Sequence, residues 1–503
     1  MIRPTGVRAS GAALRRMLGL QDGPPEQVTG VTLDSRRVRP GDLYAALGGF
    51  TTHGARFAAT ARDAGAAGVL TDPAGAALIR DAGLIDIPVL VVDDPRRVLG
   101  AVSAWVYGEP ARSLATTGVT GTNGKTTISY LLDAALRAGG HTTGLLGTVA
   151  THIGDEVLPA TRTTPEAPDL HALLAVMRER GASAVTMEVS SHALELGRVD
   201  GVHFDLAVFT NLTQDHLDFH GDMEAYYGAK AGLFTQQRSG AGLVCVDDAW
   251  GQRLVGEASI PVATYALDRP ADWTVRDVRP RSGAAGASQF TVVGPGGLHV
   301  AAGVGLAGRF NVANALAALA AAVHHGVEPQ RAADAIRDCP GVPGRMQQVA
   351  AGQDFLAIVD YAHTPDAVAR AIRATREVVT GRVITVLGCG GDRDREKRPS
   401  MGAAAARDSD IVVITDDNPR SESALAIREA IMEGAMRVDR RQRAQVLVEA
   451  DRALAIGIAT GMAQADDAVL VLGKGHEQGQ EAAGVVTPFD DRIELRRAME
   501  ALT

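Results

Sequence analysis

Short apolar segments alternate with helical periodicity along most of this chain. Continuous apolar runs that end in glycine, proline or polar loops are typical of strands buried on both faces of a parallel sheet. The pattern therefore predicts an α/β protein with strands at residues 68–70, 89–92, 184–189, 206–209, 243–246, 383–387, 411–414 and 469–472. Residues 273–300 are richer in Gly, Val and Thr, which predicts a small antiparallel sheet.

Two breaks divide this pattern into three units. Residues 107–110 end the first unit, and two prolines and two glycines within residues 339–344 would break any helix at the second boundary. A chain of 503 residues is also too long for one hydrophobic core. We predict domains at residues 1–110, 111–343 and 344–503.

The segment with the most specific chemistry joins a predicted strand to a helix at residues 120–127. Backbone N–H groups in a glycine turn and the positive end of the next helix favour a polyphosphate, Lys125 adds a charge, and the Thr126 hydroxyl can hold Mg²⁺. The usual G-x-x-x-x-G-K-[ST] spacing is not fully met, because Val119 takes the place of the first glycine. The predicted ATP-binding residues here are Gly121, Thr122, Asn123, Gly124, Lys125, Thr126 and Thr127.

Composition argues against several classes of function. A net charge of −9 and a pI near 5.8 oppose binding to nucleic acid or to an anionic membrane. The most apolar helical run, residues 312–323, is too short to span a membrane and is expected to be a core helix. Arginines interrupt the N-terminal apolar segment, so no signal peptide is predicted. Three scattered cysteines predict a reducing cytoplasm and no disulfide framework.

Polar side chains follow the predicted strands of the middle domain. Glu188 and His216 are candidate Mg²⁺ ligands if these strands are parallel, and a water-mediated contact is the alternative for His216, because Mg²⁺ prefers oxygen donors. For His192 and His220, structural hydrogen bonding is at least as good an interpretation. Periodicity alone makes Lys230 a solvated lysine on a helix.

Three predicted strands of the third domain run directly into polar loops, at residues 388–393, 416–420 and 473–477. Ligands of open α/β sheets bind at such strand ends. Residues 388–391 do not complete G-x-G-x-x-G, so an NAD site is not predicted.

Taken together, these motifs resemble the Mur ligases, which are ATP-dependent enzymes that form amide bonds in bacterial cell-wall precursor synthesis. The similar segments are residues 121–127, 188–192, 210–212, 215–218, 229–230, 308–311 and 360–365, so the resemblance covers nearly the whole chain. It implies a three-domain architecture: an N-terminal domain that binds a UDP-linked substrate, a central P-loop domain with a parallel sheet that binds ATP, and a C-terminal Rossmann-like domain that binds an amino acid.

The resemblance also implies roles for side chains that periodicity leaves unassigned. Lys230 would be carbamylated by CO₂ and would help to place the second of two Mg²⁺ ions, a reaction that needs the neutral amine of a partly buried lysine. The metal ligands would be Thr126, Glu188, His216 and carbamylated Lys230, and the nucleotide would also touch Asn311 and Arg345. The UDP-muramoyl dipeptide would touch Leu33, Ser35, Phe50, Thr51, Thr52, Thr163, Thr164, Ser190 and Arg198. Arg162 and Leu196 stand where the family often has Asn and Gln.

Within the family, residues 417–420 and 473–477 resemble the members that add diaminopimelate to UDP-N-acetylmuramoyl-L-alanyl-D-glutamate. This implies an acyl-phosphate intermediate, with Lys125, Glu188, His216 and Lys230 as catalytic residues. Arg420 and Arg393 would form paired hydrogen bonds with the distal carboxylate of diaminopimelate, and Glu477 would accept from its distal ammonium. The predicted diaminopimelate site is Arg393, Asp417, Asn418, Pro419, Arg420, Gly473 and Glu477.

Three alternatives stay open. A lysine-adding synthetase of the same family is opposed by Arg420, and a folylpolyglutamate synthetase, which shares the fold and the phosphate loop, is opposed by residues 34–36 of the N-terminal domain. A P-loop switch or motor ATPase would hydrolyse ATP without an amino acid. We expect small-molecule substrates, no nucleic-acid or membrane partner, a monomer and a cytoplasmic location.

Overall fold

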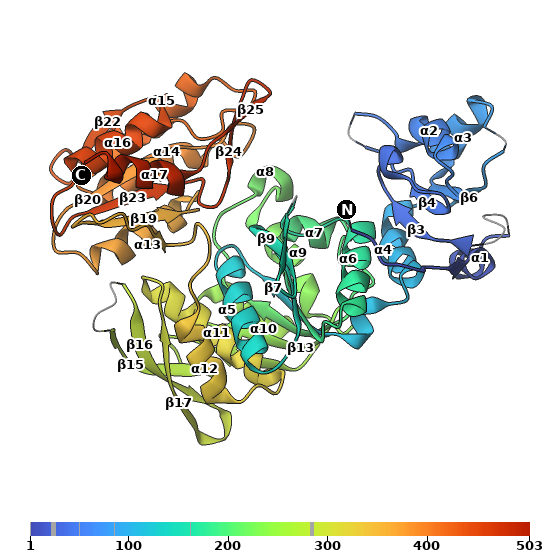
Figure 1. Ribbon diagram of the computed structural model, residues 1–503, viewed down its shortest axis with the longest axis horizontal. Helices are drawn as coiled ribbons and strands as arrows, with labels where there is room; N and C mark the ends of the chain where they lie inside the picture. Colours follow the sequence, from blue (N-terminus) through green and yellow to red (C-terminus); the bar gives the residue numbers. More distant parts are fainter. Residues whose placement is uncertain are drawn as a thin grey trace.

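A computed structural model of the chain describes residues 2–21, 27–49, 51–84, 86–160, 162–281 and 286–502. Figure 1 shows the N-terminal unit (blue) and the C-terminal unit (orange to red) on opposite sides of a central unit (cyan to yellow). Each sheet in the described residues takes all its strands from one predicted domain. The boundaries after residues 110 and 343 stay predictions, which this distribution supports.

The N-terminal unit is built around a four-stranded parallel sheet, in the order β3-β4-β5-β6. Its strands are β3 (Gly30–Thr32), β4 (Asp42–Ala45), β5 (Gly68–Thr71) and β6 (Val89–Val91), and β1 (Ala9–Ser10) pairs separately with β2 (Gln27–Val28). Its helices are α1 (Gly11–Leu18), α2 (Ala58–Asp63), α3 (Pro73–Asp81) and α4 (Pro95–Val106). Asp72 and Asp94 cap α3 and α4, each of which starts with a proline, so the sequence fixes where both helices begin.

The central unit contains an eight-stranded sheet in the order β10-β9-β8-β11-β7-β12-β13-β14, in which β9 runs antiparallel to both of its neighbours and the other pairs are parallel. The strands are β7 (Ala115–Thr120), β8 (Thr143–Leu146), β9 (Ala150–Ile153), β10 (Glu156–Pro159), β11 (Ala184–Glu188), β12 (Phe204–Phe209), β13 (Ser239–Cys245) and β14 (Val262–Tyr265). The register pairs Glu188 with Val119 and Phe209 with Thr120. The carboxyl ends of β11, β7 and β12 therefore lie at one edge of the sheet, where ligands of such sheets bind.

Helices pack on this sheet, and a smaller sheet follows it. The helices are α5 (Lys125–Ala138), α6 (Ala167–Glu179), α7 (Ser191–Glu195), α8 (Leu217–His220), α9 (Met223–Ala231), α10 (Ala249–Glu257), α11 (Arg309–His324) and α12 (Pro329–Asp338). The predicted antiparallel sheet is confirmed as β15 (Thr274–Pro280), β16 (Ser288–Gly294) and β17 (Leu298–Val304).

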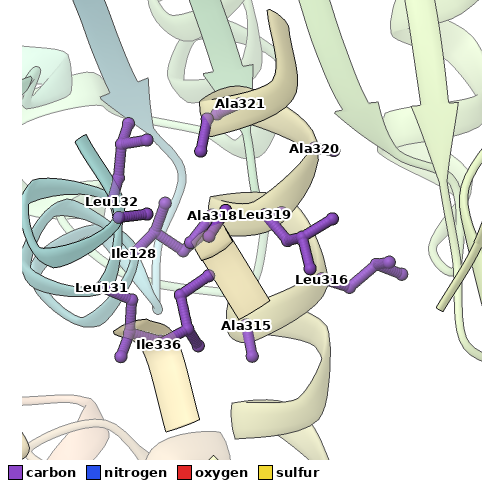
Figure 2. Close-up of a cluster of buried hydrophobic side chains, with 14 of the residues drawn as sticks. Ile128, Leu131, Leu132, Ala315, Leu316, Ala318, Leu319, Ala320, Ala321 and Ile336 are labelled. Carbon is purple, nitrogen blue, oxygen red and sulfur yellow. The ribbon is translucent and has the colours of Figure 1, made fainter. Parts of the chain in front are cut away.

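The predicted core helix at residues 312–323 is also confirmed, as part of α11. Ile128 and Leu132 of α5, Leu316 and Leu319 of α11 and Ile336 of α12 belong to one buried cluster, in which the Leu316 side chain is directed away from α5 (Figure 2). Each of these side chains is almost fully buried, which contributes about 1.5–3 kcal/mol per residue. This packing fixes α5, and with it the phosphate loop from which α5 starts.

The C-terminal unit has a six-stranded sheet in the order β18-β19-β23-β20-β21-β22, parallel except for β18. The strands are β18 (Gln347–Gln348), β19 (Leu356–Asp360), β20 (Val383–Leu387), β21 (Ile411–Ile414), β22 (Gln445–Val448) and β23 (Ala468–Leu472). The helices are α13 (Pro365–Arg376), α14 (Lys397–Asp408), α15 (Ala424–Met436), α16 (Arg452–Met462) and α17 (Asp491–Glu500), and β24 (Gly479–Ala482) forms a hairpin with β25 (Val485–Pro488).

Among the residues that the structure describes, every helix lacks either the length or the apolar stretch needed to cross a bilayer.

Candidate active site

A strand, a glycine turn and a helix build the phosphate loop. Gly121 and Gly124 have φ angles of 141° and 92°, a region in which residues with a Cβ are strained. A Cβ on Gly121 would collide with Thr210, and one on Gly124 would lie 2.6 Å from the Asn314 side-chain oxygen. Thr210 Oγ1 also donates to the carbonyl of Asn123 at 2.6 Å. The end of β12 thus fixes the turn that follows β7.

Lys125, the first residue of α5, folds back over this turn. Its Nζ donates to the carbonyl oxygens of Gly121 and Thr122, each at 2.9 Å. Burial lowers the pKa of Lys125 from its ordinary value, although the Glu188 carboxylate opposes that shift. The amino group is therefore held at the mouth of the loop, where an incoming phosphate would take over its hydrogen bonds.

Glu188 ends β11 as a buried carboxylate, 1% exposed, beside this loop. Its Oε2 accepts from Thr126 Oγ1 at 2.9 Å and from Thr148 Oγ1 at 3.0 Å, and its Oε1 accepts from the Thr148 backbone N–H at 2.8 Å. Arg345 Nη2 donates to Thr126 Oγ1 at 3.0 Å, across the predicted boundary at residue 343. One hydroxyl therefore links the carboxylate, the loop and the third unit.

Lys230 is 1% exposed, so the prediction from periodicity, a solvated lysine, is wrong. Helix α9 packs Tyr226, Tyr227 and Lys230 inward together. The Lys230 Nζ donates to the Gly121 carbonyl at 2.9 Å and lies 4.6 Å from the centre of the Tyr226 ring. Burial, and then the charge of Lys125, lower its pKa well below the ordinary value, against a weaker opposing effect of Asp215. A neutral amine is the form that reacts with CO₂.

His216 precedes α8 in the left-handed region, with φ of 55°. Its Nε2 lies 3.4 Å from Asp215 Oδ2, and its ring meets that of His192 edge-on at 4.8 Å. Burial lowers the pKa of His216 to about 3, against the attraction of Asp215, so the ring is neutral at physiological pH and keeps a lone pair. His220 Nε2 contacts Ser191 Oγ at 2.9 Å, in line with its structural interpretation.

A cavity of about 590 Å³ opens between the central and C-terminal units above the phosphate loop. Asn311 and Arg345 both line it, and the Arg345 guanidinium stacks 4.5 Å from the centre of the Tyr361 ring. Gly121 and Lys230, which are joined by a hydrogen bond, do not line the cavity. The predicted residues that line the cavity are Thr122, Asn123, Gly124, Lys125, Thr126, Thr127, Thr163, Glu188, Ser190, His216, Asn311 and Arg345.

The residues predicted for the UDP-muramoyl dipeptide lie partly in the central unit and partly in the N-terminal unit. Thr164 Oγ1 donates to the Glu188 carbonyl at 2.8 Å and accepts from the Ser190 backbone N–H at 3.1 Å, and Thr163 accepts from Thr148 at 3.0 Å. The Arg198 Nε lies 2.9 Å from Glu166, and burial lowers the pKa of Arg198, against the attraction of Glu166. These residues continue the central site away from the phosphate loop.

The uridine-side residues belong to the N-terminal unit and do not line the cavity. Leu33 follows β3, Ser35 starts the next turn and is 7% exposed, and Thr51 and Thr52 are exposed. Phe50 lies outside the described residues. Of the two departures from the family pattern, Arg162 is exposed, and the Leu196 carbonyl accepts from Arg96 of α4 at 3.3 Å.

The predicted amino-acid residues gather at the carboxyl ends of β20, β21 and β23, outside the 590 Å³ cavity. Asn418 Nδ2 donates to Glu477 at 2.7 Å, and Arg420 Nη1 donates to the Gly391 carbonyl at 2.6 Å, close to the loop that carries Arg393. Arg393 itself is exposed and donates to the neighbouring Asp392 carbonyl. Arg420 thus contacts the loop that carries Arg393, and Asn418 contacts the loop that carries Glu477. We call Arg393, residues 417–420 and residues 473–477 the amino-acid cluster.

Arg420 has φ of 53°, an uncommon conformation for a residue with a long side chain. Its backbone N–H donates to the Glu481 carbonyl at 3.0 Å, and its own carbonyl accepts from the Ala483 N–H at 2.7 Å. The guanidinium Nε lies 3.5 Å from the Glu481 carboxylate. The β24–β25 hairpin therefore supports the strained backbone and supplies a partly exposed carboxylate beside the guanidinium.

Comparison with known proteins matches three family models along the chain: "Mur ligase family, catalytic domain" at residues 27–105, "Mur ligase middle domain" at residues 119–322, and "Mur ligase, glutamate ligase domain" at residues 344–475. The chain belongs to the Mur ligase family. Two curated relatives are both named UDP-N-acetylmuramoyl-L-alanyl-D-glutamate–2,6-diaminopimelate ligase. The relative from Streptomyces coelicolor is 54% identical over 99% of this chain and 98% of its own, and the one from Corynebacterium glutamicum is 46% identical over 94% and 92%. A solved structure with the same name has a TM-score of 0.65 and 34% identity over 95% of this chain and 96% of its own.

In this Mur ligase, sequence reasoning passed over several side chains that complete the site. Thr148 supplies two of the hydrogen bonds to Glu188 from a loop without any motif. Lys397 of α14 lies 4.0 Å from Asp215 and connects the third unit to the central one. Lys474 is fully buried and donates to Asn418 Oδ1 at 2.9 Å. A lysine between two glycines at a strand end was the signal that could have identified Lys474.

The oxygen donors of this Mur ligase fit magnesium. Among the residues described, no group of three or more acidic, histidine or cysteine side chains is placed to hold a metal by itself. Mg²⁺, however, usually keeps several waters and binds through one or two protein oxygens together with substrate phosphates. Glu188 Oε2 and Thr126 Oγ1 are two such oxygens. They are joined by a hydrogen bond and lie beside the turn that would bind the phosphates.

Proposed function

We propose that this chain is the ATP-dependent ligase that joins 2,6-diaminopimelate to UDP-N-acetylmuramoyl-L-alanyl-D-glutamate in peptidoglycan precursor synthesis. The observation that supports it most is the presence, on one chain, of a glycine turn with a half-buried lysine and of a cluster with arginine and carboxylate groups at the strand ends of the third unit. The names of the full-length relatives support the same assignment.

The first step is transfer of the γ-phosphoryl group of ATP to the γ-carboxylate of the D-glutamyl residue. Both reactants are anions, so the site must offset their repulsion as they approach. Lys125 holds the phosphates against the loop amides, Arg345 can turn from Thr126 toward the nucleotide, and the Ser190 and Thr164 hydroxyls orient the peptide. Mg²⁺ bound to Thr126, Glu188, His216 and the carbamate of Lys230 would add positive charge at the phosphoryl group.

In the second step, the amine of diaminopimelate attacks the acyl carbon of the acyl phosphate, an amide bond forms, and phosphate leaves with the C–O electron pair. The amino-acid cluster lies outside the present cavity, so closure of the third unit over the central one would bring the amine to the acyl group and exclude water. The Lys397–Asp215 and Asn123–Asp366 contacts lie where such closure would act.

A phosphate-release assay with ATP, the UDP-muramoyl dipeptide and a panel of amino acids tests this proposal. We expect release only when dipeptide and diaminopimelate are both present, with the tripeptide product identified by mass spectrometry. Release without an amino acid would favour a switch ATPase, release with lysine the lysine-adding enzyme, and release with a folate and glutamate the folylpolyglutamate synthetase. Running meso- and LL-diaminopimelate separately assigns the stereoisomer. The monomeric state and the cytoplasmic location stay predictions.

Arg420→Ala tests the choice of amino acid. Loss of a charged hydrogen-bond donor costs about 1.5–3 kcal/mol, so kcat/KM for diaminopimelate should fall roughly 10- to 200-fold while KM for ATP stays within about twofold. Arg395→Ala, in the neighbouring loop and paired with Glu422, is the matched control and should change neither value. The intact site should prefer diaminopimelate to lysine by roughly 10⁴-fold. Equal losses toward ATP and diaminopimelate would discredit the role of Arg420.

A further inference from the structure

One arginine lies beneath both loops of the amino-acid cluster. Arg452 begins α16 and is the largest fully buried side chain among the described residues. Its Nε and Nη2 donate to the two carboxylate oxygens of Asp491 at 2.7 and 2.8 Å, and both side chains are 0% exposed. Asp491 begins α17, so the forked ion pair joins the starts of two helices on one face of the sheet.

The same guanidinium reaches the ends of two strands. Its Nη2 donates to the Leu472 carbonyl at 2.9 Å and its Nη1 to the Asp416 carbonyl at 3.3 Å. Leu472 is the last residue of β23 and precedes Gly473, and Asp416 precedes Asp417 after β21. One planar group therefore contacts the peptide units from which both halves of the amino-acid cluster start.

The sheet alone does not fix the spacing between these two loops. In the strand order β23-β20-β21, β20 lies between the two strands, so no ladder of hydrogen bonds joins β23 to β21 directly. Beyond the strand ends, the loops are joined by the Asn418–Glu477 and Asn418–Lys474 bonds within the cluster, and from below by Arg452. A rigid fork with five donors suits this bridging task better than the single point charge of a lysine.

Stability alone is a weak reason for such a pair. The cost of taking both charges out of water can exceed their attraction, and well-packed apolar replacements are often as stable. The contacts that apolar replacements cannot reproduce are the two with the strand-end carbonyls.

We propose that Arg452, held by Asp491, is a positioning residue for the amino-acid substrate, which sets the spacing between the loop of Asn418 and Arg420 and the loop of Glu477. It does not touch the substrate. The inference rests on the proposed function, because the cluster is assigned to diaminopimelate there.

The test is the double variant Arg452→Met/Asp491→Leu, which removes both charges and keeps apolar volume. We expect it to fold, and KM for diaminopimelate to rise roughly tenfold or more, since displacements near one ångström in a site cost up to about 10²-fold. The preference for diaminopimelate over lysine should fall by a similar factor, while KM for ATP stays within about twofold. A purely structural role would lower the melting temperature and leave this preference unchanged.

Arg382→Met is the matched control. Arg382 pairs with Asp467 at 2.7 Å and donates to the Met462 carbonyl, but it lies at the opposite end of the same sheet, before β20. This variant should keep the wild-type KM for diaminopimelate. If the double variant does not fold, Arg452→Lys takes its place, because it keeps the charge and loses the fork.

An unchanged KM and preference in a folded Arg452 variant would overturn the inference, as would an equal rise in KM for ATP. Wild-type protein assayed beside it separates the two proposals. If the wild type forms no tripeptide, the proposed function fails, whereas a wild type that forms tripeptide beside an unaffected variant rejects only the role of Arg452.

Discussion

Two fully buried lysines occupy opposite electrostatic surroundings in this molecule. Lys230, in the central unit, has a backbone carbonyl and a tyrosine ring as its close neighbours, with the cation of Lys125 nearby. Lys474, in the C-terminal unit, lies 3.7 Å from Asp417 and 3.4 Å from Glu477 and donates to Asn418 at 2.9 Å. The first site disfavours an ammonium, and the second is built around one.

The difference separates a reactive group from a structural one. A buried amine without an anionic partner is costly to charge, so it stays neutral and nucleophilic. A buried ammonium between carboxylates offsets their repulsion and orients them. Burial and the neighbouring Asp417 raise the pKa of Glu477, against the attraction of Lys474, so the cluster depends on that lysine to keep Glu477 ionised for an incoming ammonium.

Lys230→Met should have the largest effect on this comparison. It fills the same space without an amine, so no carbamate can form, and we expect turnover to fall by roughly 10³-fold or more, the scale of losing one preorganised electrostatic group. Exposure to ¹³C-labelled CO₂ should give a carbamate NMR signal in the wild type and none in the variant. Lys474→Met should keep that signal, and an active Lys230→Met enzyme would refute the carbamate assignment.

Lys474→Met should change the amino-acid cluster, the second of the two lysine sites compared. It leaves Asp417 and Glu477 without their shared cation, and breaking a buried pair costs about 3–5 kcal/mol; because Glu477 is 30% exposed, we expect roughly 2 kcal/mol of lost stability. KM for diaminopimelate should rise about tenfold as Glu477 takes up a proton, and KM for ATP should not change. The double variant Lys474→Met/Glu477→Gln should regain stability without regaining diaminopimelate affinity. Recovery of both properties would show that Lys474 does not act through Glu477.

Much of the fold is readable from the sequence. Continuous apolar runs predicted some of the parallel strands in each of the three units, and the Gly-Lys-Thr-Thr turn predicted the strand-to-helix junction at Lys125. The predicted strands did not include β3, β4, β8, β14, β19 and β22. In β22, polar and apolar residues mix at the sheet edge. Edge strands lack the two buried faces that make a strand visible as a continuous apolar run.

The site itself was only partly accessible in this way. Periodicity counts turns of a helix and cannot show that α9 meets the back of the phosphate loop, so the burial of Lys230 depends on tertiary packing. Thr148 and Lys397 approach Glu188 and Asp215 from elements distant in sequence. The Arg452–Asp491 pair joins positions 39 residues apart, a relation that no local pattern carries.

The smallest expected effect is on the pH dependence of stability, which also distinguishes Lys230 from Lys474. Because folding lowers the pKa of Lys230, the unfolded chain binds one more proton between the folded pKa and about 10.4, and stability rises with pH through this window by about 1.4 kcal/mol per unit. In CO₂-free buffer at neutral pH, Lys230→Met should therefore melt a few degrees higher than the wild type, and this advantage should shrink as the pH approaches about 10. Lys474→Met should melt lower than the wild type at neutral pH, since it removes a cation that is paired with two carboxylates. Thermal scans of the three proteins across this pH range measure whether each variant melts above or below the wild type. An Lys230→Met protein that melts below the wild type at neutral pH would mean that the buried amine has a favourable partner.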